Sequence, residues 1–582
     1  MNEIKKIPYG QSTFMDMSKE NAYYVDRTMY ISEIEDTKYV FLIRPRRFGK
    51  SLFLSTLYAY YDVKDQEEFD TVFKNTWIHN NQTPYRGKYL ILYFNFSAIT
   101  KDIGLMQSDF NNYCCTVIDE FLYIYREYIP DRISKAVEAD ELAHAKLHKL
   151  AVMLNDTEHK LYILIDEYDH FTNVLLSEQG IEAYHAITKG VGFFKQFFIN
   201  LKFLTSGKGS ALERLFITGV SPTTMDDVSS GFNIGDNISL LPKFNNIVGF
   251  TEKEAREILA YYISAGKLNV DIEESVAIFR KWYDNYRFSD KAKESLYNTD
   301  CIWYFVKDSM RSDGILTDVV NDNLRMDTRK LSNLVVLNKQ LNGNFDILSE
   351  VINTGKTYSV INKSFPYEQI TQPDNFVSML YFLGLLTFSK DDNDYQPCLK
   401  IPNETIKKLM FEYITNCLSS AYEANVSFNT RTFNSLILNM IRFGDYKPVF
   451  EFITNEMNKK TSIRDFIYGE NVVKLFFLFY LSYYDYFFVS TEKELNKGYA
   501  DVVMMPNSLK YKDLNYMYLI EFKYIKRSVE GEAFKTELNK KMADAKAKLE
   551  QYADADEVDK ISMVKLISVF YGWEMIVLEN VL

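Results

Sequence analysis

Cysteine is scarce in this chain of 582 residues, and histidine is missing from its C-terminal two thirds. The five cysteines show no metal-site spacing, and their odd number does not suggest a disulfide framework. We therefore expect a protein of a reducing compartment. Because no histidine follows His185, histidine-based metal chemistry is excluded for the C-terminal part. The cysteines are Cys114, Cys115, Cys301, Cys398 and Cys417.

The chain also lacks a long hydrophobic run and an excess of positive charge. The most apolar stretch, residues 475–489, is short for a membrane span and contains Asp485, so a buried helix is the better interpretation. The N-terminus shows no apolar signal core, and we expect a cytoplasmic protein with no membrane partner. A formal net charge of −12 argues against broad adhesion to nucleic acid but does not exclude a local basic groove.

What the chain has in plenty is apolar and aromatic side chains. Hydrophobic residues make up 47% and charged residues 25%, which is typical of a globular protein. A chain of this length is too long for one core and predicts three or four domains.

Residues 44–51, Arg-Pro-Arg-Arg-Phe-Gly-Lys-Ser, form the most informative segment. An apolar run precedes them at 39–43 and another follows at 52–57, which predicts a strand, a tight loop and a helix. Gly-Lys-Ser at a helix start is typical of a phosphate-binding P-loop. Gly49 lets backbone amides approach phosphate oxygens, Lys50 brings a cation to the terminal phosphates, and Ser51 can ligate Mg²⁺.

The loop departs from the generic pattern, because Arg44 stands where that pattern has its first glycine. An ordinary Gly-Lys-Ser at a helix start is the alternative. If the loop binds a nucleotide, we expect Arg46, Arg47 and Phe48 to contact it as well.

Two further apolar runs end in polar residues. Residues 160–165 lead into Asp166 and Glu167. A P-loop NTPase needs an acidic residue at a strand end for its Mg²⁺, and a second carboxylate can orient or deprotonate the attacking water. We assign these roles to Asp166 and Glu167 respectively; solvated acids at a strand end are the alternative. Residues 214–221 predict a neighbouring strand whose Thr218 and Ser221 sense the γ-phosphate, unless they are only turn formers.

The C-terminal part predicts a second site on two paired strands. Residues 497–505 suggest a turn and a strand, and residues 516–523 the returning strand. Side chains alternate along a strand, so Glu521 and Lys523 share one face, with Asp501 on the neighbouring strand. Two carboxylates can hold Mg²⁺, to which Glu470 could add a third, and a lysine can orient water. The alternative is an edge strand whose charges prevent aggregation.

These segments together resemble bacterial AAA-ATPase-like proteins with a C-terminal nuclease-like domain of the PD-(D/E)XK superfamily. In that family the phosphate loop also lacks its first glycine. One departure is Tyr499, where family members often carry arginine. The segments that carry the resemblance are residues 7–10, 24–28, 44–51, 164–169, 217–221, 249–251, 282–288 and 521–523.

The resemblance and the order of elements predict an α/β chain of four parts. They are an AAA-like P-loop NTPase core with a parallel sheet at 1–245, a helical lid at 246–365, a winged-helix-like and helical connector at 366–460, and a PD-(D/E)XK nuclease-like α/β domain at 461–582. Thr251 and Glu254 predict a capping box at the start of the lid. Residues 366–403 predict a helix and a hairpin with its tip at 390–394.

The function that the resemblance implies is ATP binding and hydrolysis coupled to Mg²⁺-dependent, endonuclease-type cleavage of DNA. A lysine-rich helix at 535–552 could follow a phosphate backbone. The alternatives are a nucleotide-dependent switch, or an oligomeric scaffold, whose nuclease-like domain holds nucleic acid or protein without cutting. A homo-oligomer stays open. The candidates for an arginine finger are Arg46, Arg47, Arg214 and Arg287.

Overall fold

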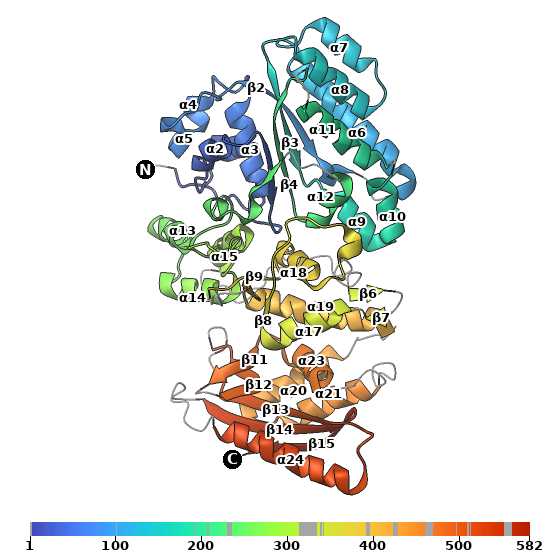
Figure 1. Ribbon diagram of the computed structural model, residues 1–582. Helices are drawn as coiled ribbons and strands as arrows, with labels where there is room; N and C mark the ends of the chain where they lie inside the picture. The colour runs from blue at the N-terminus through green and yellow to red at the C-terminus, as the bar shows by residue number, and fades with distance from the viewer. Residues whose placement is uncertain are drawn as a thin grey trace. The chain divides into compact units, whose positions relative to one another are not determined.

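A computed structural model gives the structure of the chain (Figure 1). It describes residues 3–99, 102–190, 192–206, 209–229, 235–312, 335–337, 340–341, 343–390, 396–422, 429–459, 470–495, 498–508, 511, 514–551 and 561–581. The chain forms two compact units. The first contains Met1–Met326 and Ser359–Pro402, and the second contains Asp327–Tyr358 and Asn403–Leu582. The finer division into four parts stays a prediction.

The first unit is built on a five-stranded parallel sheet in the order β2-β3-β4-β1-β5. Its strands are almost continuous apolar runs, because both faces of a parallel sheet are covered. The prediction that the strand at 214–221 lies beside the acidic strand is confirmed, since β4 pairs with β3. The strands are β1 (Tyr39–Ile43), β2 (Tyr89–Asn95), β3 (Lys160–Asp166), β4 (Leu212–Gly219) and β5 (Asp236–Asn237).

Helices cover both faces of this sheet (Figure 1). Helix α3 (Lys50–Tyr61) lies on one face, while α6 (Ile103–Ile124), α8 (Ala143–Leu154) and α11 (Phe193–Ser206) bury an aromatic-rich core on the other. The remaining helices up to residue 229 are α1 (Phe14–Lys19), α2 (Met29–Ile34), α4 (Phe69–Val72), α5 (Trp77–Asn80), α7 (Asp131–Glu138), α9 (His170–Gln179), α10 (Ile181–Thr188) and α12 (Pro222–Ser229).

The segment after the sheet is helical, as predicted. It contains α13 (Glu252–Ser264), α14 (Ile272–Trp282) and α15 (Thr299–Ser312). The predicted capping box at the start of α13 is confirmed, with Thr251 as the N-cap and Glu254 as its partner. The predicted helix and hairpin are α18 (Pro373–Phe382) and the antiparallel strands β9 (Thr387–Phe388) and β10 (Cys398–Lys400). Apart from Lys390, the predicted hairpin tip lies outside the described residues.

The second unit contains a mixed five-stranded sheet in the order β11-β12-β13-β14-β15, in which only β13 and β14 run parallel. A turn with Gly572 at φ 61° connects β14 to β15, which pairs with it in the antiparallel direction at the edge of the sheet. The strands are β11 (Phe487–Leu495), β12 (Gly498–Pro506), β13 (Tyr516–Ile525), β14 (Ser562–Tyr571) and β15 (Glu574–Asn580).

Helix α24 (Gly531–Glu550) packs on this sheet, where Ala545 and Leu549 join the core, and α23 (Glu470–Leu481) contacts β13. The single helix predicted for residues 475–489 is wrong: α23 ends at Leu481, and Phe487 already begins β11. Of the predicted lysine-rich helix, Tyr552 lies outside the described residues. The other elements are α17 (Gly343–Thr354), α19 (Glu404–Tyr422), α20 (Thr430–Phe443), α21 (Lys447–Lys459), β6 (Val336–Leu337), β7 (Gln340–Leu341) and β8 (Lys356–Tyr358).

Within the described part of the chain, no helix combines the length and the apolar character that crossing a membrane requires.

Candidate functional sites

The predicted phosphate loop connects the carboxyl end of β1 to the start of α3. Gly49 has φ 96° and Arg47 has φ 68°, so the chain turns through two left-handed residues before the helix begins. The start of α15 holds this loop from the side, since Thr299 Oγ1 donates a hydrogen bond to the Arg47 carbonyl at 2.7 Å and Asn298 Nδ2 donates one to the Arg46 carbonyl at 3.3 Å. The loop is therefore a fixed element of the first unit.

A cavity of about 450 Å³ opens beside the loop. It has a polar end, at the loop and the carboxyl edge of the sheet, and an apolar wall from the N-terminal segment, residues 247–250 and α15. Six of the predicted residues line it, namely Arg46, Arg47, Gly49, Lys50, Ser51 and Glu167. The wall includes Pro8, Tyr23, Val25, Val248, Phe250 and Trp303. A nucleotide-sized ligand fits a cavity of this volume.

Lys50 is almost completely buried at the start of α3. Its Nζ donates hydrogen bonds to the carbonyls of Arg44 at 3.0 Å and Pro45 at 2.9 Å. Burial lowers the pKa of Lys50, although the neighbouring Asp166 and Glu167 favour its charged form. A phosphate bound at the loop would compete with the two carbonyls for this ammonium group.

Asp166 is the last residue of β3 and is buried. Burial raises the pKa of Asp166, while a hydrogen bond with the Ser51 side chain acts in the opposite direction. Tyr93 Oη donates a further hydrogen bond at 3.4 Å. A carboxylate beside a hydroxyl offers the oxygen ligands that Mg²⁺ prefers, so Asp166 and Ser51 fit such an ion.

Glu167 follows Asp166 with φ 49°, which turns its side chain toward the cavity. His170 Nδ1, at the start of α9, lies 3.0 Å from Glu167 Oε2. The hydrogen bond with His170 lowers the pKa of Glu167, even though partial burial opposes this shift. His170 also lines the cavity, and the sequence analysis had given it no role.

If Glu167 is the general base, His170 positions it, and the variant His170→Gln should hydrolyse ATP more slowly. A positioned base contributes roughly 10²- to 10⁴-fold, so we expect a loss of about tenfold in kcat when only its orientation is disturbed. Glutamine does not supply the electrostatic stabilisation that His170 gives to the Glu167 carboxylate, so the pKa of Glu167 rises and the acid limb of the pH–rate profile moves to higher pH. The variant His144→Gln, at an exposed histidine of α8, is the control, and equal profiles for both variants would contradict this role.

Four residues predicted for the nucleotide site are not among the described residues that line the cavity, namely Phe48, Asp166, Thr218 and Ser221. Phe48 is buried, and its ring packs edge-on against Tyr286 and Phe288. Only its backbone is therefore placed to contact a nucleotide at the loop. Ser221 is buried at the end of β4, where its amide donates to Asp169 Oδ2 and its hydroxyl lies 2.9 Å from Thr223 Oγ1. Their contact with a nucleotide stays a prediction.

Arg44, which replaces the first glycine of the generic loop, points into the protein interior. Its guanidinium donates to the carbonyls of Ser239 at 2.5 Å and Phe244 at 3.0 Å and lies 4.2 Å from the centre of the Phe288 ring. Burial lowers the pKa of Arg44 to about 10. The arginine therefore connects the loop to the segment that follows β5, which is a structural role that a glycine does not perform.

We expect the variant Arg44→Met to lose about 3 kcal/mol or more of the free energy of unfolding, because buried carbonyls lose a charged donor. Chemical denaturation of the full chain measures this loss. The control is Arg46→Met in the same loop, where the side chain is exposed and the expected change is within about 0.5 kcal/mol. Equal denaturation midpoints for the two variants would refute the structural role.

Two arginine-finger candidates are engaged elsewhere. Arg214 lies near the amino end of β4, at the edge of the sheet opposite to the loop, where its side chain donates to Tyr89 Oη at 3.1 Å and to the Glu35 carbonyl at 3.1 Å. Arg287 is buried and donates to the carbonyls of Ser389 at 2.6 Å and Ala292. Of the four candidates, only Arg46 and Arg47 line the cavity.

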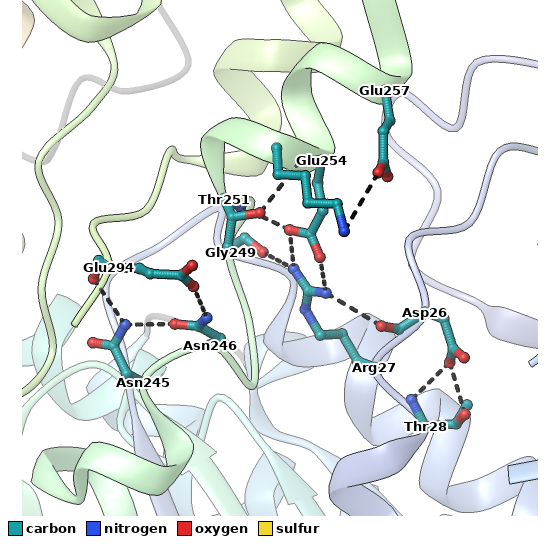
Figure 2. Close-up of polar contacts among 11 residues, drawn as sticks. Asp26, Arg27, Thr28, Asn245, Asn246, Gly249, Thr251, Glu254, Glu257 and Glu294 are labelled. Carbon is teal, nitrogen blue, oxygen red and sulfur yellow. Dashed lines mark hydrogen bonds and ion pairs between the residues drawn. The ribbon is translucent and has the colours of Figure 1, made fainter. Parts of the chain in front are cut away.

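A salt bridge joins the N-terminal wall of the cavity to the start of α13 (Figure 2). Arg27 binds Glu254 through two contacts, Nη1 to Oε1 at 2.5 Å and Nη2 to Oε2 at 2.7 Å, and Nη2 also donates to the Gly249 carbonyl at 2.6 Å. Glu254 in addition accepts a hydrogen bond from the Thr251 amide at 2.8 Å. Two segments that are far apart in the sequence, and that both carry the family resemblance, thus meet at this cavity.

The second unit brings Asp501 of β12 and Glu521 of β13 together, as predicted. The Asp501 amide donates to Glu521 Oε1 at 3.2 Å, and the Phe522 amide donates to Asp501 Oδ2 at 2.9 Å. One oxygen of each carboxylate is thus held by the backbone. Burial and the neighbouring Asp501 raise the pKa of Glu521, and the lysines around it oppose this shift.

Three lysines surround this pair. Lys523 Nζ lies 3.0 Å from Glu521 Oε2 and 3.8 Å from Asp501 Oδ2, which was predicted. Lys474 of α23, 3.8 Å from Asp501 Oδ1, and Lys548 of α24, 3.3 Å from Glu521 Oε2, were not. Burial alone would lower the pKa of Lys523, but the two carboxylates outweigh it and raise the pKa. The sequence did carry a signal for Lys474, namely its i, i+4 spacing from Glu470 on one helix.

The oxygen pair of Asp501 and Glu521 fits a hard cation such as Mg²⁺. The predicted third carboxylate, Glu470, interacts electrostatically with Lys523. It does not join the pair in a metal-binding group, since the described residues contain no cluster of three or more acidic, histidine or cysteine side chains suited to a metal. The metal-ligand role of Glu470 therefore finds no geometric support, and Lys474 is the α23 residue that faces the pair.

Comparison with protein families identifies both parts of the chain. Residues 8–229 match the family described as Predicted AAA-ATPase, and residues 468–580 match the PD-(D/E)XK nuclease superfamily. The chain carries an AAA-ATPase-like domain and a PD-(D/E)XK nuclease-superfamily domain. The AAA-ATPase-like match ends with α12, so residues 247–250 and the start of α15, which complete the cavity, lie beyond it.

Individual relatives add little. A protein of Azotobacter chroococcum mcd 1, described as an uncharacterized protein in the vnfD 5′ region, is 25% identical over 311 residues. The match covers 53% of each chain, so the chain spans about half the length of this curated relative. Two structures of the Aeropyrum pernix ORC2 protein, an ADPNP-ADP complex and an ADP form, are 12% identical. They cover 68% and 71% of this chain and 93% and 96% of their own, and a TM-score of 0.29 is too low to establish a common fold.

Proposed function

We propose that the protein binds and hydrolyses ATP and couples this to Mg²⁺-dependent cleavage of DNA. The observation that carries the proposal is the convergence of Asp501, Glu521 and Lys523 on two paired strands of a nuclease-superfamily domain. Two carboxylates and a lysine at one point are the groups that hydrolysis of a phosphodiester requires.

In the AAA-ATPase-like domain, Lys50 would bind the terminal phosphates, and the amides of the loop up to Gly49 would surround them. Asp166 and Ser51 would hold Mg²⁺, which supplies charge stabilisation at the phosphates when bound. Glu167, oriented by His170, would accept a proton from the attacking water. The position of Glu167 would therefore determine whether bound ATP is hydrolysed.

In the nuclease-superfamily domain, Asp501 and Glu521 would hold Mg²⁺, which supplies Lewis-acid activation of water and of the phosphate when bound. Lys523 would orient the attacking water or neutralise charge that develops on the phosphate oxygens. The exposed lysines of α24, among them Lys540 and Lys546, could follow the backbone of the nucleic acid. DNA as the nucleic acid, and assembly into a homo-oligomer, are parts of the proposal that the family resemblance suggests.

One observation favours a second function, a nucleotide-dependent switch that holds nucleic acid without cutting it. Three ammonium groups, those of Lys474, Lys523 and Lys548, contact the two carboxylates, so the pair is already surrounded by cations before any metal binds. Such a site attracts phosphate and resists divalent cations. If the protein is a nuclease, it needs Asp501 for cleavage. If it is a switch, it needs Asp501 only for the structure of the site.

The test is an incubation of the purified protein with supercoiled and linear DNA and Mg²⁺, with and without ATP. The variants Asp501→Asn and Lys50→Ala accompany the wild type. Cleavage by the wild type that Asp501→Asn lacks supports the nuclease, and its dependence on ATP supports the coupling. ATP hydrolysis without cleavage under any condition would favour the switch.

A further inference from the structure

Both carboxylate oxygens of Glu521 accept hydrogen bonds within the second unit. Its Oε1 accepts the hydrogen bond from the Asp501 amide at 3.2 Å, and the whole residue is buried. Its Oε2 accepts from Lys523 Nζ at 3.0 Å and from Lys548 Nζ at 3.3 Å. A divalent cation that binds Oε2 must therefore approach two ammonium groups or displace one of them.

The lysines around the carboxylate pair differ in their access to solvent. The side chains of Lys474 and Lys523 are 4% and 10% exposed, whereas that of Lys548 is 47% exposed. Lys548 also comes from α24, while Lys523 lies beside Glu521 on the same strand. Among these three, Lys548 is the ammonium group that a bound polyanion can reach and draw away from Glu521.

The ammonium groups at Glu521 Oε2 and the solvent access of Lys548 are connected by electrostatics. An ammonium group within about 4 Å of a carboxylate weakens the binding of a second cation there, and burial of Glu521 strengthens this effect. A nucleic-acid backbone offers Lys548 several phosphates as alternative partners. If Lys548 moves to a phosphate, Glu521 Oε2 loses one of its two ammonium neighbours.

We propose that Lys548 is a charge gate that couples nucleic-acid binding to metal binding at the Asp501–Glu521 pair. Lys548 neutralises Glu521 in the free protein and transfers to a backbone phosphate in the complex, so the metal binds tightly only when nucleic acid is present. The coupling is reciprocal, and metal bound at the pair strengthens the phosphate contact by the same factor. The inference rests on the proposed nuclease function and makes Lys548 a positioning residue of that site.

The test measures Mn²⁺ binding to the nucleotide-free full chain by electron paramagnetic resonance, with and without a short duplex in which every linkage is a nuclease-resistant phosphorothioate. Asp501→Asn gives the background that does not belong to this site. For the wild type we expect the duplex to tighten Mn²⁺ binding by about tenfold. For Lys548→Met we expect binding that is about tenfold tighter than wild type without the duplex and unchanged by its addition.

Two lysine variants control the test. Lys548→Arg keeps the charge and should retain the dependence on the duplex. Lys447→Met removes an exposed lysine at the start of α21, another helix of the second unit, and should behave as the wild type. Thermal unfolding of each variant checks that α24 still packs on the sheet.

The outcomes separate the gate from the function on which it rests. The gate is overturned if Lys548→Met binds Mn²⁺ as the wild type does, or if Lys447→Met has the same effect as Lys548→Met, while binding that depends on Asp501 remains. If the wild type and Asp501→Asn bind Mn²⁺ alike with and without the duplex, the pair holds no metal, and both the gate and the proposed cleavage fail.

Discussion

Replacement of Asp501 with asparagine should reduce DNA cleavage by on the order of 10³-fold or more, because it removes half of the charge that would hold Mg²⁺. Asparagine keeps an oxygen that can accept the hydrogen bond from the Phe522 amide, so the strand pairing of β12 and β13 should persist. Cleavage of supercoiled DNA and thermal unfolding, measured on the same preparation, distinguish lost chemistry from a lost fold.

The same variant should still bind DNA. Removing a negative charge from a site surrounded by three lysines favours contact with phosphate, so we expect DNA affinity at least equal to that of the wild type. Glu532→Gln, at an exposed carboxylate of α24, is the control and should cut normally. If Asp501→Asn cuts as fast as the wild type, the nuclease activity does not lie at this carboxylate pair.

Replacement of Lys50 with alanine should weaken ATP binding by about 3 kcal/mol, or roughly 150-fold, because the phosphates lose a charge-assisted donor. Hydrolysis should fall by on the order of 10³-fold, since the same ammonium group would stabilise charge in the transition state. Fluorescent-nucleotide titration measures the first effect, and phosphate release under saturating ATP measures the second.

Lys38→Ala is the matched control for Lys50→Ala. Lys38 is an exposed lysine that precedes β1, at the end of the strand opposite to the loop. Unchanged nucleotide affinity in Lys50→Ala would show that the cavity beside the loop is not the ATP site. If the variant loses ATP hydrolysis but still cuts DNA at the wild-type rate, the two domains act independently.

Several features were predictable because they depend on neighbours in the sequence. The P-loop strand, loop and helix follow from an apolar run before Gly49-Lys50-Ser51. The capping box of Thr251 and Glu254 is a local pattern of four consecutive residues. The common face of Glu521 and Lys523 follows from the alternation of side chains along β13, and their ion pair at 3.0 Å agrees with it.

Other features were missed because strand and helix ends depend on weak local preferences. The apolar stretch at 475–489 was predicted as a single helix, yet α23 ends at Leu481 and the aromatic run from Phe487 pairs with β12. Pairing with the next strand decides such a change, and periodicity in a short apolar run does not distinguish helix from strand. The additional strand β15 was missed for the same reason.

The sequence by itself determined which chemical groups the two domains carry, namely a phosphate loop, an acidic strand end and an Asp…Glu-x-Lys pair. The tertiary structure decided how those groups are surrounded. It directs Arg44 into the interior, sets His170 against Glu167, and brings Lys548 to Glu521 from a helix 27 residues further along. The physical reason is that side-chain identity and alternation are local properties, whereas burial and the position of charges arise only when distant segments pack together.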